Sequence, residues 1–163
     1  MRVLGVDPGT VRMGVGIVDS DAGELICHYY GVIKPKRSDP IERRLAHLFD
    51  SIDHIIIANS PKFVAVEEPF VSQNARTAIA IGQAQAVVLI AASRHKIPIA
   101  RYAPQEIKKS VTDYGHSSKE QVEDMVKILL NENTIDGPDD VTDALAVAIC
   151  HHNSQWLNNL VGT

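Results

Sequence analysis

An isolated carboxylate at the end of an apolar, β-rich run constrains the fold of this chain more than any other feature. The run over residues 3–6 leads into Asp7, a Pro8-Gly9 turn follows, and a second apolar run, interrupted by glycines, covers residues 14–18. This pattern predicts a β-hairpin that places Asp7 at a strand end. A charge there loses hydration unless a cation or hydrogen bonds compensate it. Asp7 therefore either binds a ligand or caps the turn, and the turn itself favours neither.

The hydrophobic periodicity of the remaining chain alternates between strands and helices. We predict strands at about 24–33, 63–66 and 97–102, and helices at about 41–56, 74–93, 104–111, 118–130 and 139–149. This order, without repeats or a linker, favours one α/β domain over residues 1–155. A C-terminal tail at 156–163 follows, and we expect Trp156 to anchor it. His151 and His152 follow the last predicted helix, near whose C-terminus positive charge is favoured.

The predicted helix at 74–93 differs from the others because small and apolar residues occur on all its sides. Asn74 is its predicted N-cap. Such a helix is either central to the domain or shared with a second subunit, and we favour the subunit interface. Its apolar stretch over 78–92 is interrupted by Gly82 and two glutamines, so we expect no membrane-spanning segment. The N-terminal residues lack a signal-peptide pattern, which predicts a cytoplasmic protein.

The net charge of −4, taken alone, argues against a polyanionic partner. The basic residues are nevertheless grouped, and each group forms either a solvated face or part of a groove. The groups are Lys34, Lys36 and Arg37; Arg43 and Arg44; and Lys108, Lys109 and Lys119. The two cysteines, Cys27 and Cys150, are far apart in the sequence, which favours small buried side chains over a disulfide.

Further carboxylates accompany the ends of predicted elements. Glu67 and Glu68 follow the apolar strand at 63–66, and they point to opposite sides if the strand continues. Asp140 and Asp143, three residues apart at the start of the last helix, lie on one helical face. Because Asp143 begins an apolar stretch, it needs a partner when it is desolvated.

Together with Asp7, these acids supply hard oxygen ligands, which suit Mg²⁺ or Mn²⁺. Two such ions roughly 3.5–4 Å apart can activate a water and stabilise the leaving oxygen in phosphodiester hydrolysis. Independent helix caps and surface acids are the alternative interpretation. Asp139 is also an alternative to Asp140, because it stands four residues before Asp143.

Four motifs, in order and at suitable separations, resemble those of the RuvC family of Holliday-junction resolvases. They are Val6-Asp7-Pro8-Gly9-Thr10, Val64-Ala65-Val66-Glu67 followed by Phe70, Gly82-Gln83-Ala84, and Asp140-Val141-Thr142-Asp143-Ala144-Leu145-Ala146. The resemblance covers nearly the whole chain. It implies a ribonuclease-H-like fold, with a mixed sheet flanked by helices, and a homodimer. It also implies Mg²⁺-dependent nicking of two opposing strands of a four-way DNA junction, with Mn²⁺ able to substitute, and a branch-migration motor complex as partner.

By the same resemblance, the metal ligands would be Asp7, Glu67, Asp140 and Asp143. Lys108 and Lys119 match basic positions near the scissile phosphate, where Lys119 would take part in catalysis. Phe70 matches an aromatic that disturbs base pairing near the crossover, and we add Arg76 as a candidate for DNA contact. The alternatives are a solubilising helix surface for the two lysines and core packing for Phe70.

Two other classes of function remain open at this point. The first is a non-catalytic scaffold that binds the junction, although binding alone gives no reason to gather carboxylates beside phosphate. The second is an actin-like or sugar-kinase-like phosphotransferase, because those folds also open with an Asp-x-Gly turn at a strand. A chain of 163 residues lacks room for the second lobe of such an enzyme.

Overall fold

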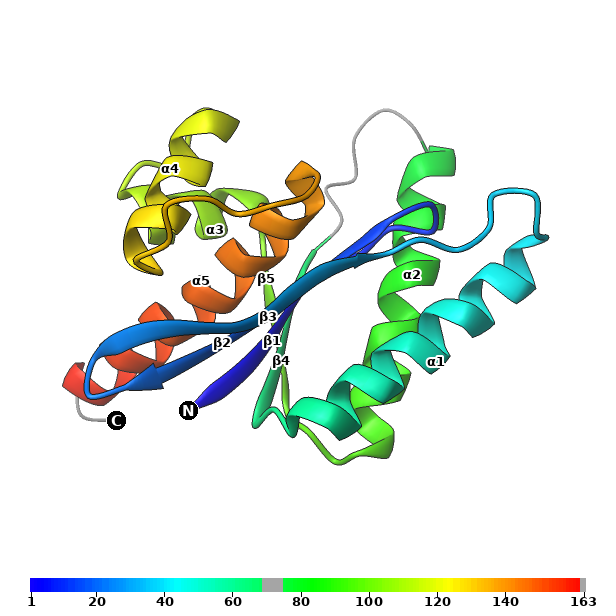
Figure 1. Ribbon diagram of the computed structural model, residues 1–163, viewed down its shortest axis with the longest axis horizontal. Coiled ribbons are helices and arrows are strands. Elements are labelled where there is room, and N and C mark those ends of the chain that lie inside the picture. Colours follow the sequence, from blue (N-terminus) through cyan, green and yellow to red (C-terminus); the bar gives the residue numbers. More distant parts are fainter. Residues whose placement is uncertain (69–74, 162–163) are drawn as a thin grey trace.

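The computed structural model describes residues 1–68 and 75–161 and shows one mixed sheet with helices on both faces (Figure 1). The strands are β1 Arg2–Asp7, β2 Met13–Asp21, β3 Glu24–Ile33, β4 Phe63–Glu67 and β5 Ile99–Tyr102. The helices are α1 Ile41–Asn59, α2 Ala75–Arg94, α3 Pro104–Thr112, α4 Lys119–Leu129 and α5 Asp139–Val161. Every predicted element is present, and the predicted cap Asn74 lies outside the described residues.

The strand order β3-β2-β1-β4-β5 places the first and fourth strands side by side in the middle of the sheet. β1 and β2 form the predicted antiparallel hairpin, whereas β1 pairs with β4 in parallel. In that parallel register Gly5 lies opposite Ala65, and Val6 lies opposite Val66. The next residues are Asp7 and Glu67, so both strands end in a carboxylate at the same edge of the sheet.

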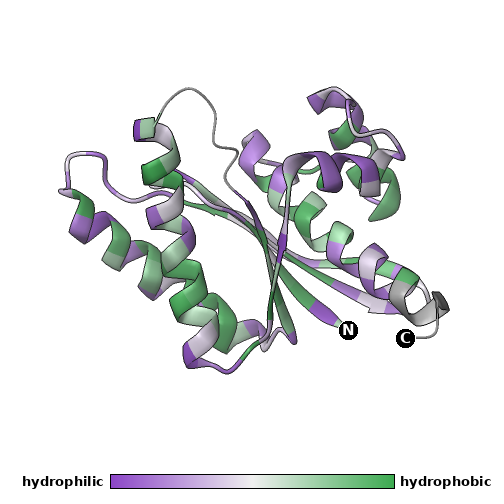
Figure 2. Ribbon diagram, turned by 180° about the vertical axis from the view of Figure 1, so that it is seen from behind, coloured by the Kyte–Doolittle hydropathy of each residue, from purple (hydrophilic) through white to green (hydrophobic). Residues whose placement is uncertain are grey.

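Alternation along the strands produces two hydrophobic cores, one on each face of the sheet. Leu4 and Val6 pack in the core covered by α1 and α2. Val3 and Ala65 pack in the other core, which α3, α4 and α5 cover. Figure 1 shows the two groups of helices on opposite sides of the sheet, and Figure 2 shows hydrophobic stretches in the strands between them.

Helix α5 lies very close to the sheet because glycines in β1 and β2 leave room for its backbone. A Cβ atom at Gly5 would overlap the carbonyl oxygen of Ala144, and one at Gly14 would overlap the carbonyl oxygen of Asp140. Any larger residue at these two positions would push the helix outward. The glycines therefore bring the first turns of α5 onto the end of β1, next to Asp7.

The prediction that the last helix ends near residue 149 is wrong, because α5 continues to Val161. His151 and His152 consequently lie inside the helix rather than near its end, and both are buried. The His151 ring packs 4.7 Å from the Phe63 ring, and its Nδ1 is hydrogen-bonded to the Tyr102 hydroxyl at 2.8 Å. Trp156 does not bury against the domain as expected, since 63% of its surface is exposed.

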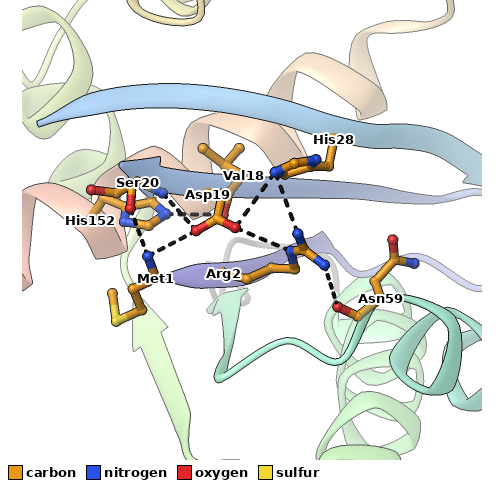
Figure 3. Close-up of polar contacts among 8 residues, drawn as sticks. All are labelled: Met1, Arg2, Val18, Asp19, Ser20, His28, Asn59 and His152. Atoms are coloured by element: carbon orange, nitrogen blue, oxygen red, sulfur yellow. Dashed lines mark hydrogen bonds and ion pairs between the residues drawn. The ribbon is translucent and has the colours of Figure 1, made fainter. Parts of the chain in front are cut away.

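The end of the sheet opposite to Asp7 is held by an ionic cluster around Asp19 (Figure 3). The Asp19 carboxylate lies 2.8 Å from the Met1 ammonium and 3.3 Å from Arg2 Nε. Arg2 Nη1 donates a hydrogen bond of 2.9 Å to the Asn59 carbonyl at the end of α1. His152 in α5 is hydrogen-bonded to the Val18 carbonyl at 3.1 Å, which links the same region to the other helical layer. These contacts tie α1 to the start of β1 and α5 to the adjacent strand β2.

Helix α2 is long and apolar enough, by length and composition alone, to cross a membrane. Gly82 and the two glutamines therefore do not take the helix below this threshold, and the expectation that no segment spans a membrane stays a prediction. One face of α2 packs in the core through Val87 and Val88, beside α1. The other face leaves Ile79 and Ile90 exposed, at 62% and 56%. The helix is therefore half-buried. One face belongs to the core of the domain, and the other is open to a second subunit.

Candidate active site

The ends of β1 and β4 bring Asp7 and Glu67 together on the face of the sheet that α5 covers. Burial, followed by the negative charges of Glu67, Asp143 and Asp140, raises the pKa of Asp7 to about 7. Burial, followed by the charge of Asp143, likewise raises the pKa of Glu67 to about 7. Glu67 rather than Glu68 shares this face, because Glu67 is in phase with Ala65 along the strand. The site thus resists negative charge until a cation joins it.

Helix α5 contributes the other two predicted acids from its first turns. Asp140 is 19% exposed and Asp143 is 28% exposed, and burial raises the pKa of Asp143. Asp139, which sequence spacing left as an alternative, is 69% exposed. Asp140 is more buried than Asp139, and its charge raises the pKa of Asp7. Both observations favour Asp140 as a member of this carboxylate cluster.

Two lysines complete a hollow next to these acids. Glu67, Asp143, Lys108 and Lys119 all line a cavity of about 210 Å³, with apolar side chains of α3, α4 and α5 as its walls. Lys119 Nζ lies 3.0 Å from Asp143 Oδ2. Lys108 Nζ donates a hydrogen bond of 3.0 Å to the carbonyl of Ser117. Both ammonium groups therefore stand where they can contact a phosphate that enters the cavity.

The local structure around Lys119 follows from its sequence. Ser118 is the N-cap of α4 and accepts a hydrogen bond from the backbone N–H of Gln121, whose side chain accepts in return from the N–H of Ser118. The two hydrogen bonds form a capping box. It starts α4 at Lys119 and so places the lysine opposite the first turns of α5.

Arg12 is a residue of the site that sequence reasoning missed. It lies in the turn between β1 and β2, and its Nε is 3.3 Å from Asp140 Oδ2. No local pattern marks an arginine in a polar turn as a partner of a carboxylate 128 positions later. The contact exists because α5 packs over Gly14, and only the tertiary structure shows that.

Of the two remaining predicted residues, Phe70 and Arg76, the structure describes only Arg76. Phe70 lies outside the described residues. Arg76 is exposed in the first turn of α2, where it lines a second hollow together with Asp140.

The donor set fits a hard divalent cation. Carboxylate oxygens are the ligands that Mg²⁺ and Mn²⁺ prefer, and the raised pKa values of Asp7 and Glu67 show a site short of positive charge. Within residues 1–68 and 75–161, no three His, Cys, Asp or Glu side chains are close enough to hold one ion as they stand. Arg12 and Lys119 instead pair with Asp140 and Asp143, so binding of a cation requires these side chains to move.

Comparison with known proteins places the chain in a family. The family model described as crossover junction endodeoxyribonuclease RuvC matches residues 3–151. Proteins of that name are 44% identical in Dehalococcoides mccartyi, over 99% of this chain and 96% of the relative, and 45% identical in Moorella thermoacetica, over 93% and 90%. The structure of Thermus thermophilus RuvC in complex with a Holliday junction substrate superposes with a TM-score of 0.92 at 30% identity, covering 97% of this chain and 96% of that one. The chain therefore belongs to the RuvC family of crossover junction endodeoxyribonucleases, with the ribonuclease-H-like fold of that family.

Proposed function

We propose that this protein is a metal-dependent, structure-selective endonuclease that resolves four-way (Holliday) DNA junctions by paired symmetric nicks during recombination and repair. The observation that carries the proposal is the meeting of four carboxylates from β1, β4 and α5 beside two lysines. Full-length similarity to proteins named for this activity supports it. A scaffold that only binds the junction has no use for carboxylates beside phosphate.

The residues suit phosphodiester hydrolysis in distinct roles. Asp7, Glu67, Asp140 and Asp143 would hold Mg²⁺, or Mn²⁺ in its place, and the bound metal would activate water and stabilise the leaving oxygen. Lys119 and Lys108, across the cavity, would neutralise charge on the scissile phosphate. Because the pKa values of Asp7 and Glu67 are about 7, a cation that binds these carboxylates releases protons near neutral pH.

We further propose that the protein acts as a homodimer joined through α2. Ile79 and Ile90 are exposed on the face of α2 that points away from the core, and a Cβ atom at Gly82 would meet no atom within 4 Å. Apolar side chains on a helix with open space beside them suit close approach of a second copy. A two-fold dimer would present two active sites to one junction and so make paired nicks.

Three further assignments extend this proposal. Phe70 would wedge between bases near the crossover, and Arg76 and Lys108 would contact DNA phosphates. A branch-migration motor complex would be a partner of the dimer on the junction. The cytoplasm is the expected compartment, where bacterial DNA lies.

The test is cleavage of an end-labelled synthetic four-way junction in Mg²⁺, with a linear duplex of the same sequence as control. We expect symmetric nicks on the junction alone, and loss of nicking with retained binding for Asp7→Asn. Junctions that stay intact in Mg²⁺ while the protein binds them would refute the catalytic part and support the scaffold. Turnover of ATP by the purified protein would support a phosphotransferase instead.

A further inference from the structure

Three arginines from separate segments surround a hollow beside the candidate active site. Arg12 in the β1–β2 turn, Arg37 in the loop between β3 and α1, and Arg76 in the first turn of α2 line this cavity of about 410 Å³. Among the described residues that line it, Asp140 alone is acidic. The arginine hollow is therefore locally cationic, although the whole chain carries a net charge of −4.

Two features prepare the arginine hollow for an anion. The N-terminal end of α2 forms part of its wall, and no acidic residue occurs anywhere in this 20-residue helix. The partial positive charge of that helix end is thus left uncompensated by a carboxylate of α2. Arg44 of α1 donates hydrogen bonds from Nε, at 3.0 Å, and from Nη2 to the Thr10 carbonyl. These bonds fix the turn that carries Arg12.

Arg12 connects the arginine hollow with the carboxylate site. Its side chain is 50% exposed, and its Nε lies 3.3 Å from Asp140 Oδ2. A guanidinium group can pair as well with a phosphate as with a carboxylate. A phosphate in the hollow would therefore compete with Asp140 for Arg12. If a cation takes over Asp140, Arg12 becomes available to the phosphate, so each ligand favours the other.

We propose that Arg12, Arg37 and Arg76 bind a DNA backbone phosphate other than the scissile one, and that Arg12 exchanges Asp140 for this phosphate when the junction binds. The inference rests on the proposed function for its DNA ligand. Lys108 and Lys119 line a separate cavity on the other side of the acids, toward α3 and α4, so the scissile phosphate and this second phosphate have different cationic partners. Arg12 is then a positioning residue, which frees Asp140 for the metal in step with DNA binding.

The second phosphate site is tested without metal, by measuring the affinity for a fluorescent four-way junction in EDTA as a function of salt. The slope of log K against log salt reports the number of phosphates neutralised. Because the three arginines share one phosphate, we expect the slope to fall in Arg12→Gln and in Arg76→Gln, by at most about 1 in each. Lys62→Gln changes the charge equally just before β4, at the opposite end of that strand from Glu67, and should leave the slope unchanged.

Equal slopes in wild type, Arg12→Gln and Arg76→Gln would overturn the inference, and so would an equal fall in Lys62→Gln. Thermal unfolding of each variant checks that it is folded. If Arg12→Gln does not fold, Arg76→Gln provides the test. A wild-type protein that does not bind the junction would overturn the proposed function and this inference together. A protein that binds and nicks the junction with unchanged slopes would overturn the inference alone.

The exchange of Asp140 is tested by a double-mutant cycle on the same metal-free affinity. Asp140→Asn should strengthen junction binding about fivefold more when Arg12 is present than in the Arg12→Gln background. Asp139→Asn is the matched control, because Asp139 precedes Asp140 in the same turn and pairs with Lys119 at 3.2 Å. Additive effects of Arg12→Gln and Asp140→Asn would show that Arg12 does not move between the two partners.

Discussion

Lys119 Nζ lies 3.0 Å from Asp143 Oδ2, and this contact joins the first residue of α4 to the first turns of α5. Burial alone would lower the pKa of Lys119, but hydrogen bonds and charge from Asp143 and Asp139 outweigh it and raise the pKa. The lysine therefore stays charged beside a carboxylate whose own pKa burial raises. A fixed positive charge stands next to the proposed metal ligands before any substrate arrives.

Replacing this lysine should slow the chemical step more than it weakens binding. We expect Lys119→Ala to reduce junction cleavage in Mg²⁺ by about 100-fold, because one preorganised charge at the reacting phosphate is lost. Lys127→Ala is the control on the same helix. Lys127 Nζ lies 2.6 Å from Glu123 Oε1, and Lys127 does not line the cavity. Single-turnover cleavage rates and junction affinities are the measurements. An equal loss of rate in both variants would contradict a specific role for Lys119.

The pKa of Asp7 predicts how stability depends on pH in the absence of metal. The carboxyl titrates near 3.8 in the unfolded chain and at about 7 in the fold, where burial and then Glu67, Asp143 and Asp140 raise it. Between these values the folded protein holds a proton that the unfolded chain has released, so its stability falls as pH rises from about 4 to 7. Above pH 7 Asp7 is ionised in the folded protein, and its destabilising effect on the fold is then at its largest.

Asp7→Asn should therefore make the metal-free protein more stable than wild type at pH 8, by about 2 kcal/mol. The difference should shrink as the pH approaches 4. Urea unfolding in EDTA measures this difference, with Asp21→Asn at the exposed end of β2 as control. Added Mg²⁺ should stabilise wild type at pH 8 but not Asp7→Asn. A destabilised Asp7→Asn protein at pH 8 would show that Asp7 is a structural cap.

The pKa of His151 predicts that, at lower pH, the stability of the fold changes with pH in the opposite direction. Burial, followed by the charge of His152, lowers the pKa of His151 from 6.5 to about 4. The unfolded chain thus binds a proton between pH 6.5 and 4 that the folded protein excludes, and stability is lost as pH falls through this range. We expect His151→Gln to remove about 1 to 2 kcal/mol of the loss between pH 7 and 5. Urea unfolding at both pH values tests this, and parallel losses in variant and wild type would contradict it.

Much of the fold and of the site could be predicted from the sequence because their signals are local. Apolar strand runs and turn residues placed Asp7 and Glu67 at strand ends, and the helix predicted at about 118–130 matches α4. The structure confirms these elements. The roles of the four acids in metal binding remain predictions. The structure adds the parallel register of β1 and β4, which puts Asp7 beside Glu67.

The errors arose where long-range packing overrides local pattern. The sequence after residue 149 is polar, so the helical periodicity fades, yet Tyr102, Phe63 and Val18 enclose His151 and His152 and the helix continues. Arg12 was missed for the same reason, since its partner is remote in sequence. The choice between Asp139 and Asp140 also depends on where α5 rests on the sheet.

The exposed face of α2 predicts the oligomeric state. If Ile79 and Ile90 lie in a dimer interface, Ile90→Glu buries a charge there and should yield monomers at micromolar concentration. Ile128→Glu is the matched control, because Ile128 is 68% exposed on α4 in the other helical layer. Light scattering coupled to size-exclusion chromatography gives the mass. Dimers that persist in Ile90→Glu would exclude this face, and monomeric wild type would refute the homodimer.

Gly5, beneath α5, affects both the stability of the fold and the position of the carboxylates that α5 carries. A Cβ atom at Gly5 would overlap the Ala144 carbonyl oxygen and crowd the backbone of Ala148, and neither helix backbone nor strand can yield without loss of packing. We expect Gly5→Ala to lower the free energy of unfolding by about 3 kcal/mol.

Gly31→Ala is the control for this substitution, because its new Cβ would meet chiefly the hydroxyl of Tyr29, the far end of a side chain that can move. We expect it to change the free energy of unfolding by less than about 1 kcal/mol. Since α5 carries Asp140 and Asp143, a folded Gly5→Ala protein should also bind Mg²⁺ more weakly than Gly31→Ala, as titration calorimetry would measure. Equal stability of the two variants would mean that α5 can lift from the sheet at little cost, and the position of the acids would then not depend on Gly5.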